Sequence, residues 1–221
     1  MKQKTEQNQV NPIKLSRQKV VLTFALLSLF GLGTSQLAQA QTEFGVRIFG
    51  GASTQSQLFN LFDNNDLKPS YGVGVSGKYI FSEGLALQSG LDYFMKRGKP
   101  TFNESQLNTS SQYLEIPLQL EFSAGEKVGF KKGQKVFFAA GPYLAYLLDA
   151  ESKSSNLTSD IIYNANKVDF GLRFTSGVSF PVFKGNTIQV SMNYDMGLSE
   201  VYKNTNDVQN KAGFISVGYV F

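Results

Sequence analysis

The sequence contains no cysteine, no histidine and no tryptophan among its 221 residues. Without cysteine, the chain forms no disulfide and offers no thiolate to a metal. Without histidine, it lacks the commonest transition-metal ligand and the usual base that activates a nucleophile. The composition therefore excludes histidine-dependent hydrolases, and the sequence predicts no catalytic residue, no metal site and no cofactor.

Long apolar runs are also lacking, since no segment reaches the ~20 residues that a helix needs to cross a bilayer. The most apolar stretch, 20–30, follows a segment with five cations and one acid and leads into Ala38-Gln39-Ala40. A basic region, a short apolar core and a small-x-small motif are typical of a secretory signal peptide. We predict a signal peptide over residues 1–40, cut between Ala40 and Gln41, rather than a membrane anchor.

The formal charge of +4 and the pI of about 9.1 come from that leader. Removing residues 1–40 takes five of the 21 cations and one of the 17 anions, which leaves 16 of each in residues 41–221. Residues 41–221 therefore have no net positive charge to attract the phosphates of nucleic acid, and we expect no nucleic-acid partner. The length of 41–221 fits one domain.

Alternation of apolar and polar residues dominates this domain. Val168, Phe170 and Leu172, for example, alternate with Asp169 and Arg173. A period of two is typical of a β-strand with two different faces. Between clusters of Gly, Asn, Ser, Asp and Lys, the pattern predicts eight strands at 43–51, 71–81, 84–97, 111–123, 134–148, 167–180, 187–199 and 211–221.

The predicted connections alternate in length. The long polar ones are 52–70, 98–110, 149–166 and 200–210, and the short ones are 82–83, 124–133 and 181–186. An antiparallel up-and-down barrel in an outer membrane has this rhythm, with long loops outside the cell and short turns in the periplasm.

The apolar face of strands such as 111–123 and 187–199 spans about nine to eleven residues of strand, which matches the ~25 Å hydrophobic band of a membrane barrel. We therefore predict an all-β, eight-stranded antiparallel up-and-down transmembrane β-barrel in the outer membrane of a Gram-negative bacterium. The other face should line the interior with nine charges: Arg47, Lys78, Asp92, Lys96, Glu115, Glu121, Asp169, Arg173 and Asp195. Four cations and five anions predict a paired plug rather than an open channel.

Aromatic residues near the predicted strand ends are typical of girdles at the two membrane interfaces. They are Tyr71, Tyr79, Phe81, Tyr93, Tyr143, Tyr146, Phe180, Tyr194, Tyr219 and Phe221. The aromatic Phe221 at the end of the last strand also predicts a signal for the outer-membrane insertion machinery. Membrane lipid and that machinery are thus the expected partners.

Three segments resemble the PorT-like outer-membrane β-barrel proteins of Bacteroidota: Tyr113 to Phe122 with its Leu-Glu-Ile-Pro-Leu core, Ala140 to Tyr146, and Asp169 to Arg173. The closing Phe221 fits the same family. This resemblance implies an outer-membrane barrel. The founding protein of the family assists a secretion system, so the resemblance also implies an accessory role of that kind.

The leading hypothesis is a structural or interaction barrel whose polar loops, such as 152–156 and 204–207, contact a protein or glycan. A narrow pore for small solutes and a soluble periplasmic barrel are the alternatives. The segment 60–66 carries oxygen ligands suited to Ca²⁺ but lacks the Gly-x₅-Glu of a helix-loop-helix site. Interior carboxylates such as Asp92 with Asp195, or Glu115 with Glu121, favour ion pairing with the neighbouring cations over acid-base catalysis.

Overall fold

The computed structural model describes residues 41–56, 67–98, 101–102, 105–106, 108–125, 129–154, 157–160, 165–183, 185–203 and 208–221. The predicted signal peptide with its cut after Ala40, the segment 60–66 and the loop residues 204–207 lie outside these ranges. Among the described residues, no helix is long and apolar enough to cross a membrane.

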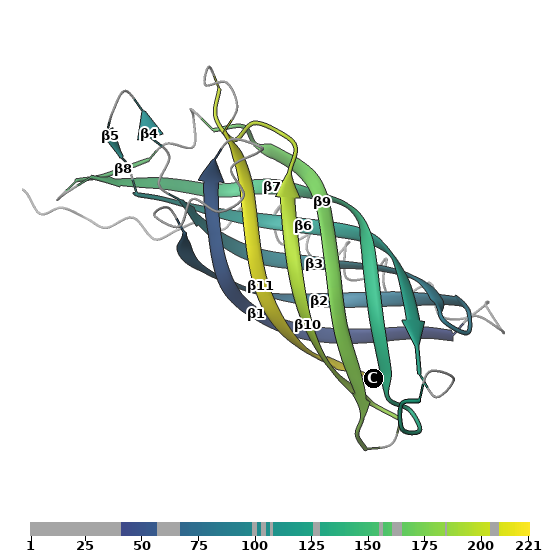
Figure 1. Ribbon diagram of the computed structural model, residues 1–221. Coiled ribbons are helices and arrows are strands. Elements are labelled where there is room, and N and C mark those ends of the chain that lie inside the picture. Colours follow the sequence, from purple (N-terminus) through teal and green to yellow (C-terminus); the bar gives the residue numbers. More distant parts are fainter. Residues whose placement is uncertain are drawn as a thin grey trace, which may run out of the picture. The chain divides into compact units, whose positions relative to one another are not determined.

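The described residues form eleven β elements (Figure 1). They are β1 (Gln41–Ser56), β2 (Lys68–Ser82), β3 (Leu85–Gly98), β4 (Thr101–Phe102), β5 (Ser105–Gln106), β6 (Asn108–Ala124), β7 (Lys135–Ser154), β8 (Leu157–Asp160), β9 (Val168–Pro181), β10 (Thr187–Gly197) and β11 (Gln209–Val220).

Eight of these strands close into a ring in the order β1-β2-β3-β6-β7-β9-β10-β11, and every neighbouring pair is antiparallel. The pairing of β1 with β11, from Gly45 with Val220 to Ser56 with Gln209, completes the ring and leaves no free edge between them. The predicted eight-stranded antiparallel barrel is therefore confirmed.

Three small elements were not predicted. Within the described part of the chain, strands β4 and β5 pair only with each other, and β8 pairs with the end of β7. These strands of two to four residues are too short to carry a visible alternation. Several barrel strands also extend beyond the predicted ends, most clearly β7, which continues six residues past 148 to Ser154, and β1, which continues five residues past 51 to Ser56.

The connections follow the predicted rhythm, with β2–β3, β6–β7 and β9–β10 joined at one end of the barrel and the longer connections at the other. In the tightest turn, Gly84 has a φ of +92°, a conformation that costs glycine little because it has no Cβ. We call these the short-turn end and the long-loop end.

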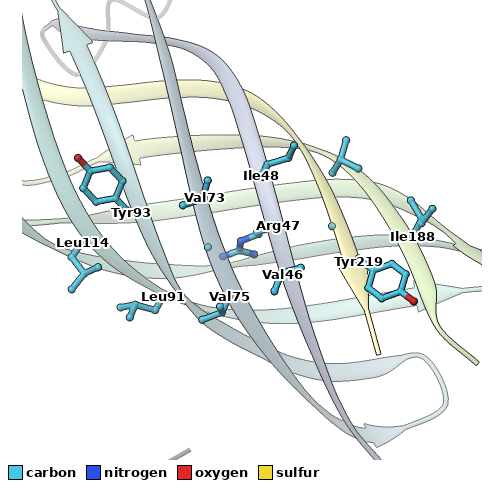
Figure 2. Close-up of a pocket in the computed structure, with 13 residues that line it drawn as sticks. Val46, Arg47, Ile48, Val73, Val75, Leu91, Tyr93, Leu114, Ile188 and Tyr219 are labelled. Atoms are coloured by element: carbon cyan, nitrogen blue, oxygen red, sulfur yellow. The ribbon is translucent and has the colours of Figure 1, made fainter. Parts of the chain in front are cut away.

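The outward face of the barrel is apolar. In β6, Ile116 and Leu118 are 48% and 47% exposed, whereas Glu115 and Gln119, which flank this pair, are buried. Figure 2 shows the same arrangement on β1 and β2, where Val46, Ile48, Val73 and Val75 lie around the inward-facing Arg47. A soluble barrel requires the opposite orientation, so that alternative is wrong.

Small interior residues make room for larger ones. A Cβ at Gly74 would overlap Oδ1 of Asp92, and a Cβ at Gly72 would overlap the ring of Phe49. These glycines on β2 thus allow a carboxylate and an aromatic ring to lie flat against the barrel wall. An eight-stranded barrel has an interior just wide enough to be filled in this way.

Candidate functional site

The nine predicted charges come from six strands and lie at three levels inside the barrel. Six of them form a central cluster: Arg47, Asp92, Lys96, Glu115, Arg173 and Asp195. Lys78 and Glu121 form an ion pair towards the short-turn end. Asp169 lies towards the long-loop end, where it is bound by neutral donors.

Arg173 is the centre of the cluster and is only 1% exposed. Its Nε and Nη2 donate to the two carboxylate oxygens of Asp195 at 2.6 and 2.8 Å. Its Nη1 donates to Asp92 Oδ2 at 2.7 Å, and Nη2 also donates to Glu115 Oε2 at 2.7 Å. Since β9 neighbours neither β3 nor β6 in the ring, the contacts to Asp92 and Glu115 cross the lumen.

Two further cations complete the cluster. Arg47 donates from Nε and Nη2 to the two oxygens of Asp92 at 2.9 and 2.8 Å. Lys96 Nζ lies 2.6 Å from Glu115 Oε1 and 3.5 Å from Asp195 Oδ2. Three cations thus face three carboxylates, and the central cluster is neutral.

Asp169 does not pair with Arg173, although both side chains lie on the inward face of β9. It lies four residues away on the same face of β9, about 13 Å at the ~3.3 Å rise of a strand. Its Oδ1 accepts from Ser199 Oγ at 2.6 Å, and its Oδ2 accepts from Asn210 Nδ2 at 2.8 Å.

Aromatic rings pack on the central cluster. The rings of Phe49, Phe94 and Phe214 form a triad with centroids 4.9 to 5.1 Å apart. Lys96 Nζ lies 4.8 Å from the centroid of Tyr143, and the Arg173 guanidinium lies 5.1 Å from that of Phe214. These cation–π contacts add to the ion pairs within a desolvated site.

Tyr143 was predicted as part of an interfacial girdle, and this is wrong, because its side chain is buried inside the barrel. The outward-facing Tyr146 lies three positions further along the strand, and alternation puts residues at an odd offset on opposite faces. Outward positions are occupied by aromatics such as Tyr71, Tyr93 and Tyr219.

A hydrophobic cluster fills the lumen at the long-loop end. It contains Tyr113, Tyr143, Ala145, Leu147, Ala150, Ala165, Val201 and Tyr202. Ala165 and Tyr202 form a β-bridge, so segments of two loops fold over the barrel mouth together. We call this cluster the outer seal.

Hydrogen bonds tie the outer seal to the barrel wall. Tyr202 Oη and Thr109 Oγ1 donate to Gln55 Oε1 at 2.7 and 2.8 Å, and Gln55 Nε2 donates to Asn210 Oδ1 at 3.2 Å. Burial raises the pKa of Tyr202 from 10.0 to about 12, so its phenol remains a donor. Asn210 Nδ2 donates in turn to Tyr113 Oη at 3.0 Å.

The sequence did not reveal Tyr202 or the polar residues that tie the outer seal to the barrel wall. Gln55, Tyr202 and Asn210 fell within predicted loops, because the strand predicted at 43–51 ended too early, the strand predicted at 211–221 began too late, and loops were interpreted as solvated. Continuing the alternation of β1 from Arg47 would have placed Gln55 on the inward face.

The short-turn end contains Lys78, whose Nζ lies 2.7 Å from Glu121 Oε1 and 3.8 Å from Glu43 Oε2. Glu43 was not among the predicted interior charges, since it opens the first predicted strand and no alternation precedes it.

The predicted insertion signal Phe221 lies just past β11. Its N–H donates to Phe44 O at 2.8 Å and its ring is exposed on the outer surface, 6.5 Å from that of Tyr219. The outward face also has a shallow apolar groove of about 670 Å³, lined by Val46, Ile48, Val73 and other aliphatic residues (Figure 2). Hydrocarbon contact requires such a lining, so the groove does not define a ligand site.

Solved structures with the same architecture come from other bacterial outer-membrane proteins. Neisserial surface protein A is 14% identical, with a TM-score of 0.50 over 82% of this chain and 97% of that chain. The outer membrane protein OprG from Pseudomonas aeruginosa is 13% identical, with a TM-score of 0.50 over 81% of this chain and 95% of that chain. These likenesses support the fold alone. No significant match was found among curated proteins.

A family model described as an outer membrane protein beta-barrel domain matches residues 35–203. That match covers more than half of the chain and agrees with a closed ring of strands that turns its apolar side chains outward. The chain therefore belongs to the outer membrane protein beta-barrel domain family and resides in the outer membrane.

Proposed function

We propose that this protein is a non-conducting outer-membrane barrel with a structural or interaction role. The observation that carries the proposal is the neutral cluster in which Arg173 joins three carboxylates across the lumen. A permeating ion would have to separate these buried pairs, and leaving one such charge uncompensated costs about 3–5 kcal/mol. The outer seal adds a second barrier of packed apolar side chains.

The competing function is a narrow pore for small solutes, and planar-bilayer recording separates the two. We expect no stepwise conductance from the purified barrel, whereas a sixteen-stranded porin recorded in parallel conducts through its aqueous channel. Reproducible single-channel steps from the barrel would overturn the proposal.

We infer further that the barrel performs no catalysis. The carboxylates that could act as paired acids, Asp92, Glu115 and Asp195, are engaged by arginine and lysine. Export by a signal peptide over residues 1–40, cut between Ala40 and Gln41, is part of the same proposal, and the N-terminal sequence of protein taken from the membrane tests it.

For the interaction role, we assign the binding surface to the long-loop end and expect a protein or a glycan as the partner. The resemblance to PorT-like barrels rests on segments that lie in β6, β7 and β9, and it favours an accessory role in a secretion system. Cross-linking on intact cells followed by purification of the barrel tests this role, because a secretion component should be captured reproducibly.

A further inference from the structure

A polar vestibule opens inside the barrel at the short-turn end. Its volume is about 430 Å³, within the ~300–1,000 Å³ of small-molecule sites. Barrel strands supply its walls, including Glu43, Lys78, Glu121, Phe137 and Gln189. Residues of the three short turns, such as Gly84, Gly133 and Gly185, also line it, so it opens on the side where short periplasmic turns lie.

The vestibule ends blindly within the barrel. The side chain of Phe137 is buried at the inner end of the vestibule. Beyond it lies a void of only about 20 Å³ among Arg47, Gln88 and Asn193, followed by the central cluster. A solute that enters from the short turns therefore meets a closed pocket and leaves the way it came.

The charges of the vestibule are unbalanced. Among the residues that the structure describes, its lining contains the carboxylates of Glu43, Glu83 and Glu121 and the ammonium groups of Lys78 and Lys135, a formal net charge of −1. This excess of one carboxylate favours a monocation over a neutral or anionic solute.

Glu121, which lines this pocket, has one buried carboxylate oxygen that is unpaired among the described residues. Its side chain is only 4% exposed, and Lys78 Nζ contacts Oε1. Oε2 has no hydrogen-bond partner among the described residues. A buried carboxylate oxygen is stabilised by an N–H donor, which an ammonium or guanidinium group supplies.

A metal ion fits less well. Among the residues that the structure describes, no group of three or more acidic side chains is arranged to hold one, whereas Ca²⁺ takes 6–8 oxygen ligands. The aromatic ring of Phe137, with Lys78 Nζ 5.7 Å from its centroid, instead offers a surface for an organic body.

We propose that the vestibule binds a small organic monocation, with a primary ammonium or guanidinium group at Glu121 Oε2 and Glu43, beside the resident ammonium group of Lys78, and with its apolar portion towards Phe137. The cation could be a free amine or the side chain of a basic residue in a periplasmic peptide. Both sources present the same chemistry to the pocket.

The test uses the exported barrel, extracted from membranes and placed in lipid nanodiscs, with isotope-labelled backbone amides followed by NMR. One arm titrates n-butylammonium chloride, and another titrates the blocked tripeptide Gly-Lys-Gly. Neutral n-butanol and sodium butyrate are the matched probes that lack the cation. We expect saturable shifts at Phe137, Ser179 and Gln189 with the cations and none with the other two.

Glu121→Gln should weaken n-butylammonium binding at least about tenfold, the factor that corresponds to about 1.4 kcal/mol. Glu200→Gln makes the same chemical change at the long-loop end and should bind like the parent. If Glu121→Gln fails to fold, Glu43→Gln decides the question, because its side chain is 35% exposed and tolerates the change.

The two cation arms identify the source. Shifts with both probes assign the site to basic side chains as well as free amines, and shifts with n-butylammonium alone restrict it to small molecules. No saturable shift with either cation, equal shifts with n-butanol, or unchanged affinity in the folded glutamate variants would overturn the proposal.

Discussion

Replacing Arg173 by Gln is the sharpest test of the central cluster. The change removes four charge-assisted hydrogen bonds to three carboxylates. Arg47 and Lys96 then face three anions, so one buried carboxylate has no counter-charge. Because breaking one side of a buried ion pair costs about 3–5 kcal/mol, we expect a loss of that size in the free energy of unfolding.

Urea unfolding of the barrel in lipid vesicles, followed by heat-modified gel mobility, measures this loss. Arg97→Gln is the matched control, because the Arg97 guanidinium donates to Met95 Sδ at 3.2 Å and stacks on Tyr71, with 5.5 Å from the guanidinium to the ring centroid. That contact is worth about 0.5–1 kcal/mol at an exposed site. Equal losses for the two variants would refute the assignment of Arg173 as the centre of the cluster.

A double variant separates charge balance from packing. Adding Glu115→Gln to Arg173→Gln leaves two cations and two anions, with Lys96 Nζ still 3.5 Å from Asp195 Oδ2. We therefore expect the double variant to be more stable than Arg173→Gln alone. If the two losses simply add, neutrality is not what stabilises the interior.

Three further changes test the facing, the terminal residue and the seal. Leu172→Arg places a cation on the lipid-facing side and should reduce the free energy of folding into lipid vesicles by about 2–4 kcal/mol. Refolding into vesicles with the parental yield would contradict the outward orientation of Leu172. Deleting Phe221 should lower the amount of folded barrel in membrane fractions more than Tyr79→Ala or Tyr194→Ala does. Equal amounts for the three variants would refute a special role of the terminal residue. Tyr202→Phe removes a buried hydrogen bond, should cost about 1 kcal/mol in urea unfolding and should speed amide exchange at the long-loop end; unchanged exchange would count against a seal held by that phenol.

The two faces of the barrel were predictable because lipid imposes a strict rule on every outward residue. Leu172 and Arg173 could be assigned to opposite sides from alternation alone, and a shift by one residue would have reversed both. The number of strands followed from the same periodicity and from the turn residues between them.

The pairing inside the barrel was not predictable in the same way. Alternation tells which face Asp92 and Asp169 occupy but not their height in the barrel, which depends on strand tilt and stagger. Arg173 therefore meets Asp92, 81 positions away in the chain, rather than Asp169 on its own strand. The sequence did not predict the outer seal, because Val201 and Tyr202 belong to a polar connection whose packing depends on a second loop.

The junction of β1 with β11 has a consequence for assembly. These are the first and last strands of the ring, so the sheet keeps two open edges until both are present and paired. The central cluster draws on strands spread around the same ring and becomes neutral only when they surround a common lumen. A half-inserted sheet would present uncompensated charges to hydrocarbon, and membrane entry is therefore expected to be cooperative, with partially inserted forms too costly to accumulate.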